Sequence, residues 1–299
     1  FMPHTHTKTS ILFFEKNKTE NEYEIFMGKV ENCGHDSRGT IILDSKGNIK
    51  EDLSAMIKKY QDFLKGNLEE NKNNFIIKSS ELIESILVPN YYDFELLTHT
   101  KKHERNKDYE FVSLGQLEED GHITIRNVPS STSKNSYGSG EISFIRTTDI
   151  ANGEITYPTI HSVSQEIFEE YKYKQGLKEH DILFVKDGTY RIGYSVLLFK
   201  NDLNCLVQSH FKIIRVNKKD LIEPFLLFFL LQQEIVQKQI QSNIFTQATL
   251  SSIGKRIYNI KIPIPKNLDE KERITKLARG ALTTRNRLKH KFLNLKIKI

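Results

Sequence analysis

ISFIRTTDIANGEITYPTI, residues 142–160, and LKEHDILFVKDGTYRIGY, residues 177–194, decide the fold of this chain. The first segment contains the apolar run Ile142 to Ile145 and the second the run Asp181 to Val185, each short enough for a buried strand. Hydrogen-bonding side chains follow both runs: Arg146, Thr147, Thr148 and Asp149 follow the first, and Lys186 and Asp187 the second. The pattern predicts two strands with polar tips.

The second tip is predicted to be a hairpin turn. Asp187-Gly188 stands between apolar residues, and an Asp-Gly pair there is a strong turn signal because Gly accepts a positive φ. Such a turn would push Lys186, Thr189, Tyr190 and Arg191 out of the sheet together. The alternative is a plain surface turn, with Arg146 as a solvated strand end.

The order of these and later segments resembles the target recognition domain of type I restriction-modification specificity subunits. The resemblance covers about half of the chain, from Arg146–Ile150 to the last helix, and the family's usual Gly and Gln are replaced by His180 and Lys271. The matching segments are Arg146–Ile150, Gly153–Ile155, SQEIFEEYKYK at 164–174, Leu177, Asp181–Gly188, Gly193, Ser209 in a predicted strand, Pro224–Leu226 opening an apolar helix, Ile262–Pro265, and Glu272–Ile274 opening the last helix.

This resemblance implies an α/β fold and sequence-specific binding of double-stranded DNA that directs adenine methylation, with or without cleavage, to a target. Competing hypotheses are a protein-protein assembly module of the same complex and part of a polypeptide with its own nuclease activity. The expected DNA-binding residues are Arg146, Thr147, Thr148, Lys186, Asp187, Gly188, Thr189, Tyr190, Arg191 and Ser209. The target sequence does not follow from one chain, because side-chain preferences for base edges depend on geometry.

Charge and composition agree with a DNA partner. From Asp269 onward there are ten Lys and Arg against three Asp and Glu, a net charge of +7, so the preceding 268 residues carry −1 of the +6 of the whole chain. This basic segment would contact phosphates or form a solvated helix face. Two distant cysteines, Cys33 and Cys205, fit a reducing cytoplasm, and the sequence has neither a membrane-length apolar run nor a signal peptide.

The first 66 residues carry a second resemblance. Strands are predicted at Ser10–Phe14 and Tyr23–Glu31, a turn at Asp44–Asn48, and a helix from Leu53 whose apolar residues recur on one face. THTKTSILFFEK, EIFMGKVENCGHDSRG and this helix look like the last strands and closing helix of the catalytic domain of adenine-specific DNA methyltransferases of the type I modification class.

That second resemblance, together with a start at Phe1, implies a C-terminal piece of a methyltransferase polypeptide with a specificity domain fused behind it. The family's glycine-containing cofactor loop and its Asn-Pro-Pro-Tyr motif are absent from these residues. We therefore expect no catalytic residue and no cofactor on this chain, and S-adenosylmethionine in the parent enzyme. VPNYY at 88–92 is interpreted as a structural entry into the recognition domain.

Other chemistry is weakly indicated. His99 and His103 have the spacing of two metal ligands on a helix, but basic neighbours and missing companion ligands argue against a metal. Glu170 and Lys172, with Asp149 upstream, have the spacing of a nuclease motif. They fall in a predicted helix, whereas such groups are expected on strands, so cleavage by this chain is the lesser alternative.

The last helix has apolar residues at a seven-residue interval: Ile274, Ala281, Leu288 and Leu295. This repeat favours packing along another helix, with docking on its own domain as the alternative. In specificity subunits the corresponding helix is a spacer and docks modification subunits, so a methyltransferase partner and a homodimer through this helix are both expected. The predicted domains are 1–66 (methyltransferase remnant), 67–84 (linker), 85–265 (target recognition domain) and 266–299 (spacer or dimerisation helix).

Overall fold

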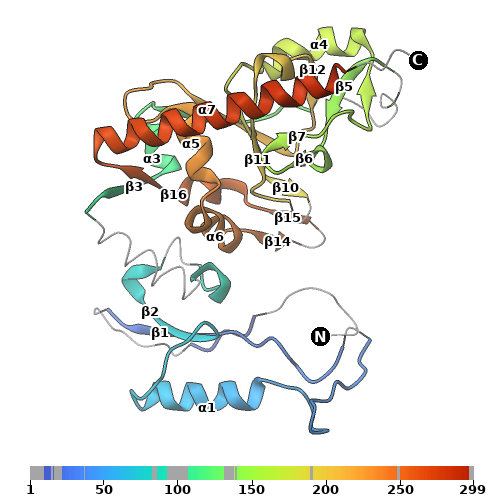
Figure 1. The fold of residues 1–299 in the computed structure, drawn as a ribbon. Helices are drawn as coiled ribbons and strands as arrows, with labels where there is room; N and C mark the ends of the chain where they lie inside the picture. The colour runs from blue at the N-terminus through green and yellow to red at the C-terminus, as the bar shows by residue number, and fades with distance from the viewer. Residues whose placement is uncertain are drawn as a thin grey trace. The chain divides into compact units, whose positions relative to one another are not determined.

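The structure is a computed structural model that describes residues 10–14, 16, 22–36, 38–82, 86–92, 107–130, 138, 140–188, 191–247 and 250–295. The chain divides into two compact units, Phe1–Lys101 and Lys102–Ile299 (Figure 1). The fold is mixed α/β with a long C-terminal helix, as the sequence predicts. Among the described residues, no helix has both the length and the apolar character needed to cross a bilayer.

The first unit is a two-stranded antiparallel sheet covered by one helix. Phe26, on the first strand, contacts the rings of Tyr60 and Phe63 on the helix, each with a centroid distance of 5.6 Å. Met27 pairs in register with Phe75, and both are buried. The elements are β1 (Glu24–Gly28), α1 (Leu53–Leu64), β2 (Asn74–Lys78) and the 3₁₀ turns η1 (Ser79–Glu81) and η2 (Pro89–Tyr92).

Three predictions for this unit differ from the structure, and two agree with it. The helix is confirmed, as is the turn at 44–48, where the Asp44 carboxylate accepts from the backbone N–H groups of Lys46 and Asn48 and the pKa of Asp44 is thereby lowered. The strand predicted at 23–31 is shorter, and the described residues 10–14 form no strand. The range 67–84, predicted as a linker, contains β2, because Phe75 and Ile77 supply one buried face after the Asn-rich stretch.

The second unit is built on a four-stranded antiparallel sheet in the order β11-β9-β13-β4. A three-stranded sheet, β12-β5-β8, lies against it, and in this sheet β5 and β12 run parallel. The strands of these two sheets are β4 (Ile123–Asn127), β5 (Ile142–Ile145), β8 (Ser162–Val163), β9 (Ile182–Val185), β11 (Ser195–Leu197), β12 (Cys205–Val207) and β13 (Phe211–Val216).

Shorter strand pairs and helices complete this unit. The pairs are β3 (Tyr109–Ser113) with β16 (Lys261–Pro265), β6 (Ile150–Ala151) with β7 (Glu154–Ile155), and the sheet β10 (Asp187–Gly188), β15 (Leu250–Ser252), β14 (Phe245–Gln247). The helices are α3 (Leu114–Glu119), α4 (Gln165–Gln175), α5 (Pro224–Leu231), α6 (Glu234–Ser242), α7 (Leu268–Leu293), η4 (Thr147–Asp149), η5 (Lys200–Asp202) and η6 (Gly254–Asn259).

β9 is buried on both faces, which explains its unbroken apolar sequence ILFV. Ile182 and Phe184 belong to the core that includes the residues of α5, and Leu183 and Val185 to the core that includes β5 and β12. Two layers therefore fix the position and direction of β9. β11 and β13 pair with β9 on either side, so its position also fixes theirs.

The helix predicted over 164–174 is confirmed as α4, which is shifted by one residue at each end. Ser164 caps its start by accepting from the backbone N–H of Ile167, and Gly176 ends it in the left-handed conformation at φ 52°. Arg215 of β13 holds this end to the sheet, donating to Gly176 O at 2.8 Å and to both carboxylate oxygens of Asp181 at 2.7 Å. Asp181 is almost fully buried, so this ion pair is part of the interior.

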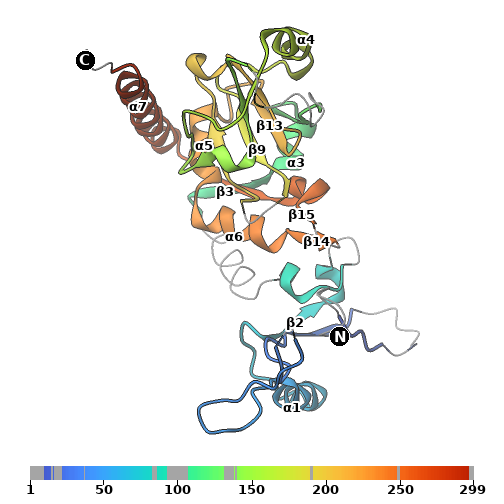
Figure 2. The ribbon, with the colours of Figure 1, turned by 90° about the vertical axis from the view of Figure 1, so that its right-hand side faces the viewer.

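The C-terminal helix α7 lies against its own domain, beside α5 (Figure 2). Ala278 is buried in the main core, and Ile274 and Leu282 pack on the same core. Further along, Arg285 forms a 2.7 Å ion pair with Glu154, and Lys289 lies 3.5 Å from the buried carboxylate of Asp202. The alternative of docking on its own domain is thus realised on one face of the helix.

Candidate nucleic-acid interface

Four strand ends meet at one end of the second unit. β5 and β12 run parallel and end at Ile145 and Val207, and the next residue, Gln208, donates its N–H to Ile145 O at 2.9 Å. β9 ends at Val185, which pairs with Phe211, the first residue of β13. The predicted polar tips, which are 40 residues apart in the sequence at Arg146 and Lys186, therefore lie at the same end of the two sheets.

The first tip is a capped 3₁₀ turn. The buried carboxylate of Asp149 accepts from the backbone N–H of Arg146 at 2.8 Å, which closes the turn. Thr147 is buried, Thr148 is exposed, and the Arg146 guanidinium is in hydrogen-bond contact with the ring of His161. Of the predicted binding residues in this turn, Thr148 has the side chain most open to solvent.

Arg191 connects the two tips. Its guanidinium donates to the carbonyl oxygens of Thr148 and Ile150, both at 2.7 Å, and to that of Thr147 at 3.4 Å. Bonds from a charged donor to several carbonyls hold a loop firmly. Arg191 therefore fixes the backbone that presents Thr148.

The hairpin predicted at the second tip is present, since β9 pairs antiparallel with β11, but the prediction that Asp187-Gly188 forms its turn is wrong. Gly188 has the positive φ of 110° that the sequence suggests, but Asp187 and Gly188 form β10 and pair with Ser252 and Ser251 of β15. The chain turns back to the sheet only at Gly193, whose N–H donates to Val185 O. The reason is that the backbone of Asp187 and Gly188 pairs with β15, a strand from far along the chain, and so does not form a tight turn.

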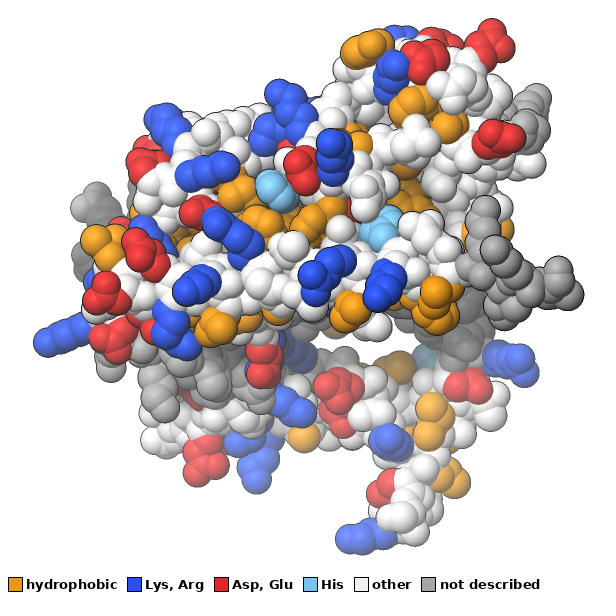
Figure 3. Space-filling model, turned by 45° about the horizontal axis from the view of Figure 1, so that its top comes forward, with side chains coloured by type: hydrophobic (Ala, Val, Ile, Leu, Met, Phe, Trp, Pro, Cys, Tyr) orange, Lys and Arg blue, Asp and Glu red, His pale blue; other side chains and the backbone are white. Residues whose placement is uncertain are grey.

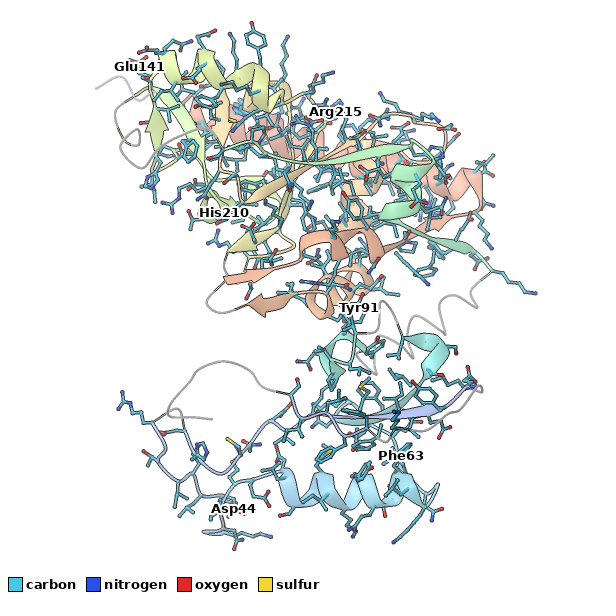
Figure 4. The ribbon with its side chains drawn as sticks, turned by 180° about the vertical axis from the view of Figure 1, so that it is seen from behind. Asp44, Phe63, Tyr91, Glu141, His210 and Arg215 are labelled. Atoms are coloured by element: carbon cyan, nitrogen blue, oxygen red, sulfur yellow. The ribbon has the colours of Figure 1, made fainter. Side chains whose placement is uncertain are left out.

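The side chains of Lys186, Asp187 and His210 lie close together at this second tip. Lys186 Nζ lies 3.5 Å from Asp187 Oδ2, and His210 Nδ1 is in hydrogen-bond contact with Asp187 Oδ1. The backbone N–H of Lys186 also donates to His210 O at 2.9 Å. Figure 4 labels His210 at the start of β13 and Arg215 further along the strand. Thr189 and Tyr190, two other predicted binding residues, lie outside the described residues.

Ser209 is not in a strand, contrary to the prediction. It lies in the turn between β12 and β13, a turn that Phe211 N–H closes on Gln208 O at 3.4 Å. The apolar residues on both sides belong to two different strands, which the polar run Gln208-Ser209-His210 separates. Ser209 nevertheless lies between Gln208, which bonds to Ile145 at the first tip, and His210, which bonds to Lys186 at the second.

Several neighbours of this end were not predicted: His161, His210, Lys212 and the hairpin β14–β15. Lys212 had a visible signal, because it interrupts the apolar run of β13 and a lysine there is either paired or functional. The hairpin had none, since its pairing with β10 joins residues more than 60 positions apart.

The possible nuclease and metal groups do not assemble among the described residues. Glu170 and Lys172 both lie on α4, where Lys174 is 3.4 Å from Glu170 and Lys172 pairs with Glu169, whereas Asp149 caps its own turn. In the part of the chain that the structure describes, no group of three His, Cys, Asp or Glu side chains is placed to hold a metal ion. His99 and His103 lie outside the described residues.

The sequence from just before β3 to the middle of α7 matches a known family. Residues 106–278 fit the model of the type I restriction modification DNA specificity domain, and this range is more than half of the chain. The chain belongs to this family. The specificity domain thus includes both strand tips, the hairpin β14–β15 and the first half of α7.

Solved structures of the same system are similar to this chain at low identity. The S subunit of a type I restriction-modification system from M. genitalium is 13% identical with a TM-score of 0.39, over 58% of this chain and 38% of that one. The HsdS subunit from Thermoanaerobacter tengcongensis is 18% identical with a TM-score of 0.37, over 67% and 46%.

A third similar structure comes from work on complex assembly and conformational transition of the type I R-M system. It is 16% identical with a TM-score of 0.38, over 85% of this chain and 59% of that one. The chain therefore spans less than two thirds of the length of each of these structures. No curated protein matches the chain.

Proposed function

We propose that the second unit recognises a specific double-stranded DNA sequence and directs adenine methylation to it in a restriction-modification system. The observation that carries this proposal is the convergence of polar strand tips at one end of a DNA specificity domain. Thr148 is exposed and Lys186 is partly exposed at these tips, and Arg191 fixes the first tip. A firmly held loop is suited to base discrimination, because the free protein is already ordered.

The proposal is tested by selecting bound duplexes from a random library and then measuring competition between the selected and scrambled duplexes. Thr148→Ala should reduce affinity for the selected duplex by about 1 to 3 kcal/mol if Thr148 contacts a base, and leave the scrambled duplex unchanged. Thr283→Ala, on the exposed face of α7, is the matched control. Recovery of no preferred sequence would overturn the proposal.

A methyltransferase catalytic domain is the proposed partner, either fused ahead of this chain or supplied as a modification subunit. The first unit supports this, because its sequence resembles the end of such a catalytic domain and its helix α1 exposes Leu53, Ile57 and Leu64 along one side. Exposed apolar stripes of this kind mark protein contacts. S-adenosylmethionine would be held by that partner, and not by the residues of this chain.

Self-association through α7 is a second proposed contact. The face of α7 that does not pack on the domain exposes Leu277, Leu288 and Phe292. A groove of about 430 Å³ runs between α5 and α7 and is lined largely by apolar residues, among them Phe228, Phe229 and Leu277. Figure 3 shows Lys and Arg side chains interspersed with hydrophobic ones over the face that α7 crosses. A second α7 would cover this stripe and supply a second recognition domain.

A further inference from the structure

A lysine is buried inside the central sheet at its DNA-facing end. Lys212, the second residue of β13, has a relative exposure of 6%. Its ammonium group donates to the side-chain oxygen of Asn127 at 3.3 Å and lies 5.7 Å from the centre of the Tyr258 ring. Both partners are neutral. An ammonium group has three donors and is seldom buried without a carboxylate, so its surroundings call for an explanation.

The register of the sheet places Lys186 on the same face as Lys212, one residue beyond the end of β9. Lys212 pairs with Phe184 on one side and with Asn127 on the other. Side chains alternate between faces along a strand, so Lys186, two residues after Phe184, projects on the same face as Lys212. Asn127 and Lys212 thus lie opposite each other on β4 and β13, and Lys186 follows the end of β9 on the same face, at the end where the strand tips meet.

The carboxylates near these three side chains have other partners. Glu118 accepts from the backbone N–H of Ile125. Burial raises the pKa of the Tyr258 hydroxyl, and the charge of Glu118 and its hydrogen bond with this hydroxyl raise it further. Asp187 is in contact with His210 and lies 3.5 Å from Lys186. Burial lowers the pKa of Lys212, and the neighbouring charge of Lys186 lowers it further, whereas the charges of Glu118 and Asp187 raise it by less. The two lysines repel each other, and an anion between them would remove the repulsion.

We propose that Lys186 and Lys212 together bind one phosphate group of the DNA backbone, with Asn127 orienting the Lys212 ammonium group. This rests on the proposed DNA recognition and adds the contact that sets the position of the duplex. A phosphate contact is the same for every sequence, so it fixes register while the neighbouring tips discriminate bases. On binding, Lys186 exchanges the carboxylate of Asp187 for the phosphate.

The exchange predicts an unusual effect of Asp187. Asp187→Asn keeps a hydrogen-bonding group for His210 and removes the charge that competes with phosphate for Lys186. The variant should bind duplex DNA of arbitrary sequence more tightly than the wild-type chain. Weaker binding of Asp187→Asn would overturn the proposal, because it would show that Asp187 and Lys186 act as a structural pair.

The main experiment uses the full chain and a fluorescent duplex of arbitrary sequence, titrated over a range of salt concentrations. The double variant Lys186→Gln, Lys212→Met should reduce the slope of log affinity against log salt by about 0.9, the value for one phosphate. A reduction near 1.8 would mean two separate phosphates and would overturn the shared site. An unchanged slope would overturn the contact altogether.

Controls distinguish loss of the phosphate contact from misfolding, from binding of free phosphate and from failure of the proposed DNA recognition. Lys218→Gln, beyond the other end of β13, should leave the slope unchanged. If Lys212→Met fails to fold in a thermal melt, Lys186→Gln alone still tests the site, because Lys186 is partly exposed. Stabilisation of wild-type protein, but not of the double variant, by inorganic phosphate with an unchanged DNA slope would assign the site to free phosphate and overturn the DNA contact. A wild-type chain that binds no duplex would instead defeat the proposed function.

Discussion

The two ends of β13 place a basic side chain in opposite surroundings. At one end Arg215 donates to both oxygens of the buried Asp181 and to a backbone carbonyl, so its charge is neutralised inside the protein. At the other end Lys212 is more deeply buried, yet it contacts an amide and an aromatic ring. The ion pair of Arg215 with Asp181 therefore stabilises the fold. Lys212 has no carboxylate among these direct contacts, which is why we propose an anionic ligand for it.

Removing the ion pair of Arg215 with Asp181 should have the largest effect on stability. Arg215→Met leaves the Asp181 carboxylate buried without its charged partner, and this should cost about 3 kcal/mol of the free energy of unfolding. The hydrogen bond with Asp181 also raises the pKa of Arg215, as expected for a favourable pair. Chemical denaturation measures the loss, with Lys218→Gln as a control. A change below about 1 kcal/mol would place this pair among weak surface ion pairs.

The second prediction concerns the link between the two tips. Arg191→Ala removes three hydrogen bonds to the backbone of 147–150 and should cost about 1 to 3 kcal/mol of stability. Because the loop that presents Thr148 is then free to move, discrimination between selected and scrambled duplexes should fall as well. Competition binding measures this, and Arg287→Ala on the exposed side of α7 is the control. Unchanged discrimination would remove Arg191 from the positioning of the site.

The third prediction tests the exposed face of α7. Leu277→Glu puts a charge into the groove between α5 and α7 and should weaken self-association by at least about tenfold, which is 1.4 kcal/mol. Thr283→Glu adds the same charge at an exposed position outside the apolar repeat and should have little effect. Light scattering over a concentration series measures the change. An equal response of both variants would contradict a specific α7 contact.

Local signals account for what the sequence predicted correctly. The helix over 164–174 and the apolar helix that opens with Pro224 are each read from a few adjacent residues, and both are confirmed as α4 and α5. The family resemblance assigned DNA binding to both tips, but no local pattern predicted that they lie at the same end of the two sheets. The features that the sequence analysis did not predict depend on pairing between distant segments. Asp187-Gly188 pairs with β15, and β2 pairs with β1. Pairing between distant segments leaves little trace in either segment alone.

Lys212 illustrates the same difference within a single strand. Its position in an apolar run was visible, but its meaning depends on which groups surround it, and these come from β4, β9 and η6. Arg215, three residues further on, looks equivalent in the sequence. Only the structure separates a cation in contact with a carboxylate, Arg215, from one whose direct contacts are neutral groups.

The smallest expected effect completes the comparison of the two ends. Lys212→Met removes a buried ammonium group that lacks a carboxylate and replaces it with an apolar chain of similar length, so the free energy of unfolding should stay within about 1 kcal/mol of the wild-type value or increase. The pKa of Lys212 is lowered in the folded state. Between this lowered pKa and the ordinary lysine value of about 10.4, the unfolded chain binds more protons than the folded chain. The contribution of Lys212 to the free energy of unfolding of the wild-type chain therefore rises with pH over this range. The variant should lack that rise. Denaturation at neutral and alkaline pH measures both effects, and a loss as large as that of Arg215→Met would show that Lys212 is a structural cation and that the two ends of β13 do not differ in kind.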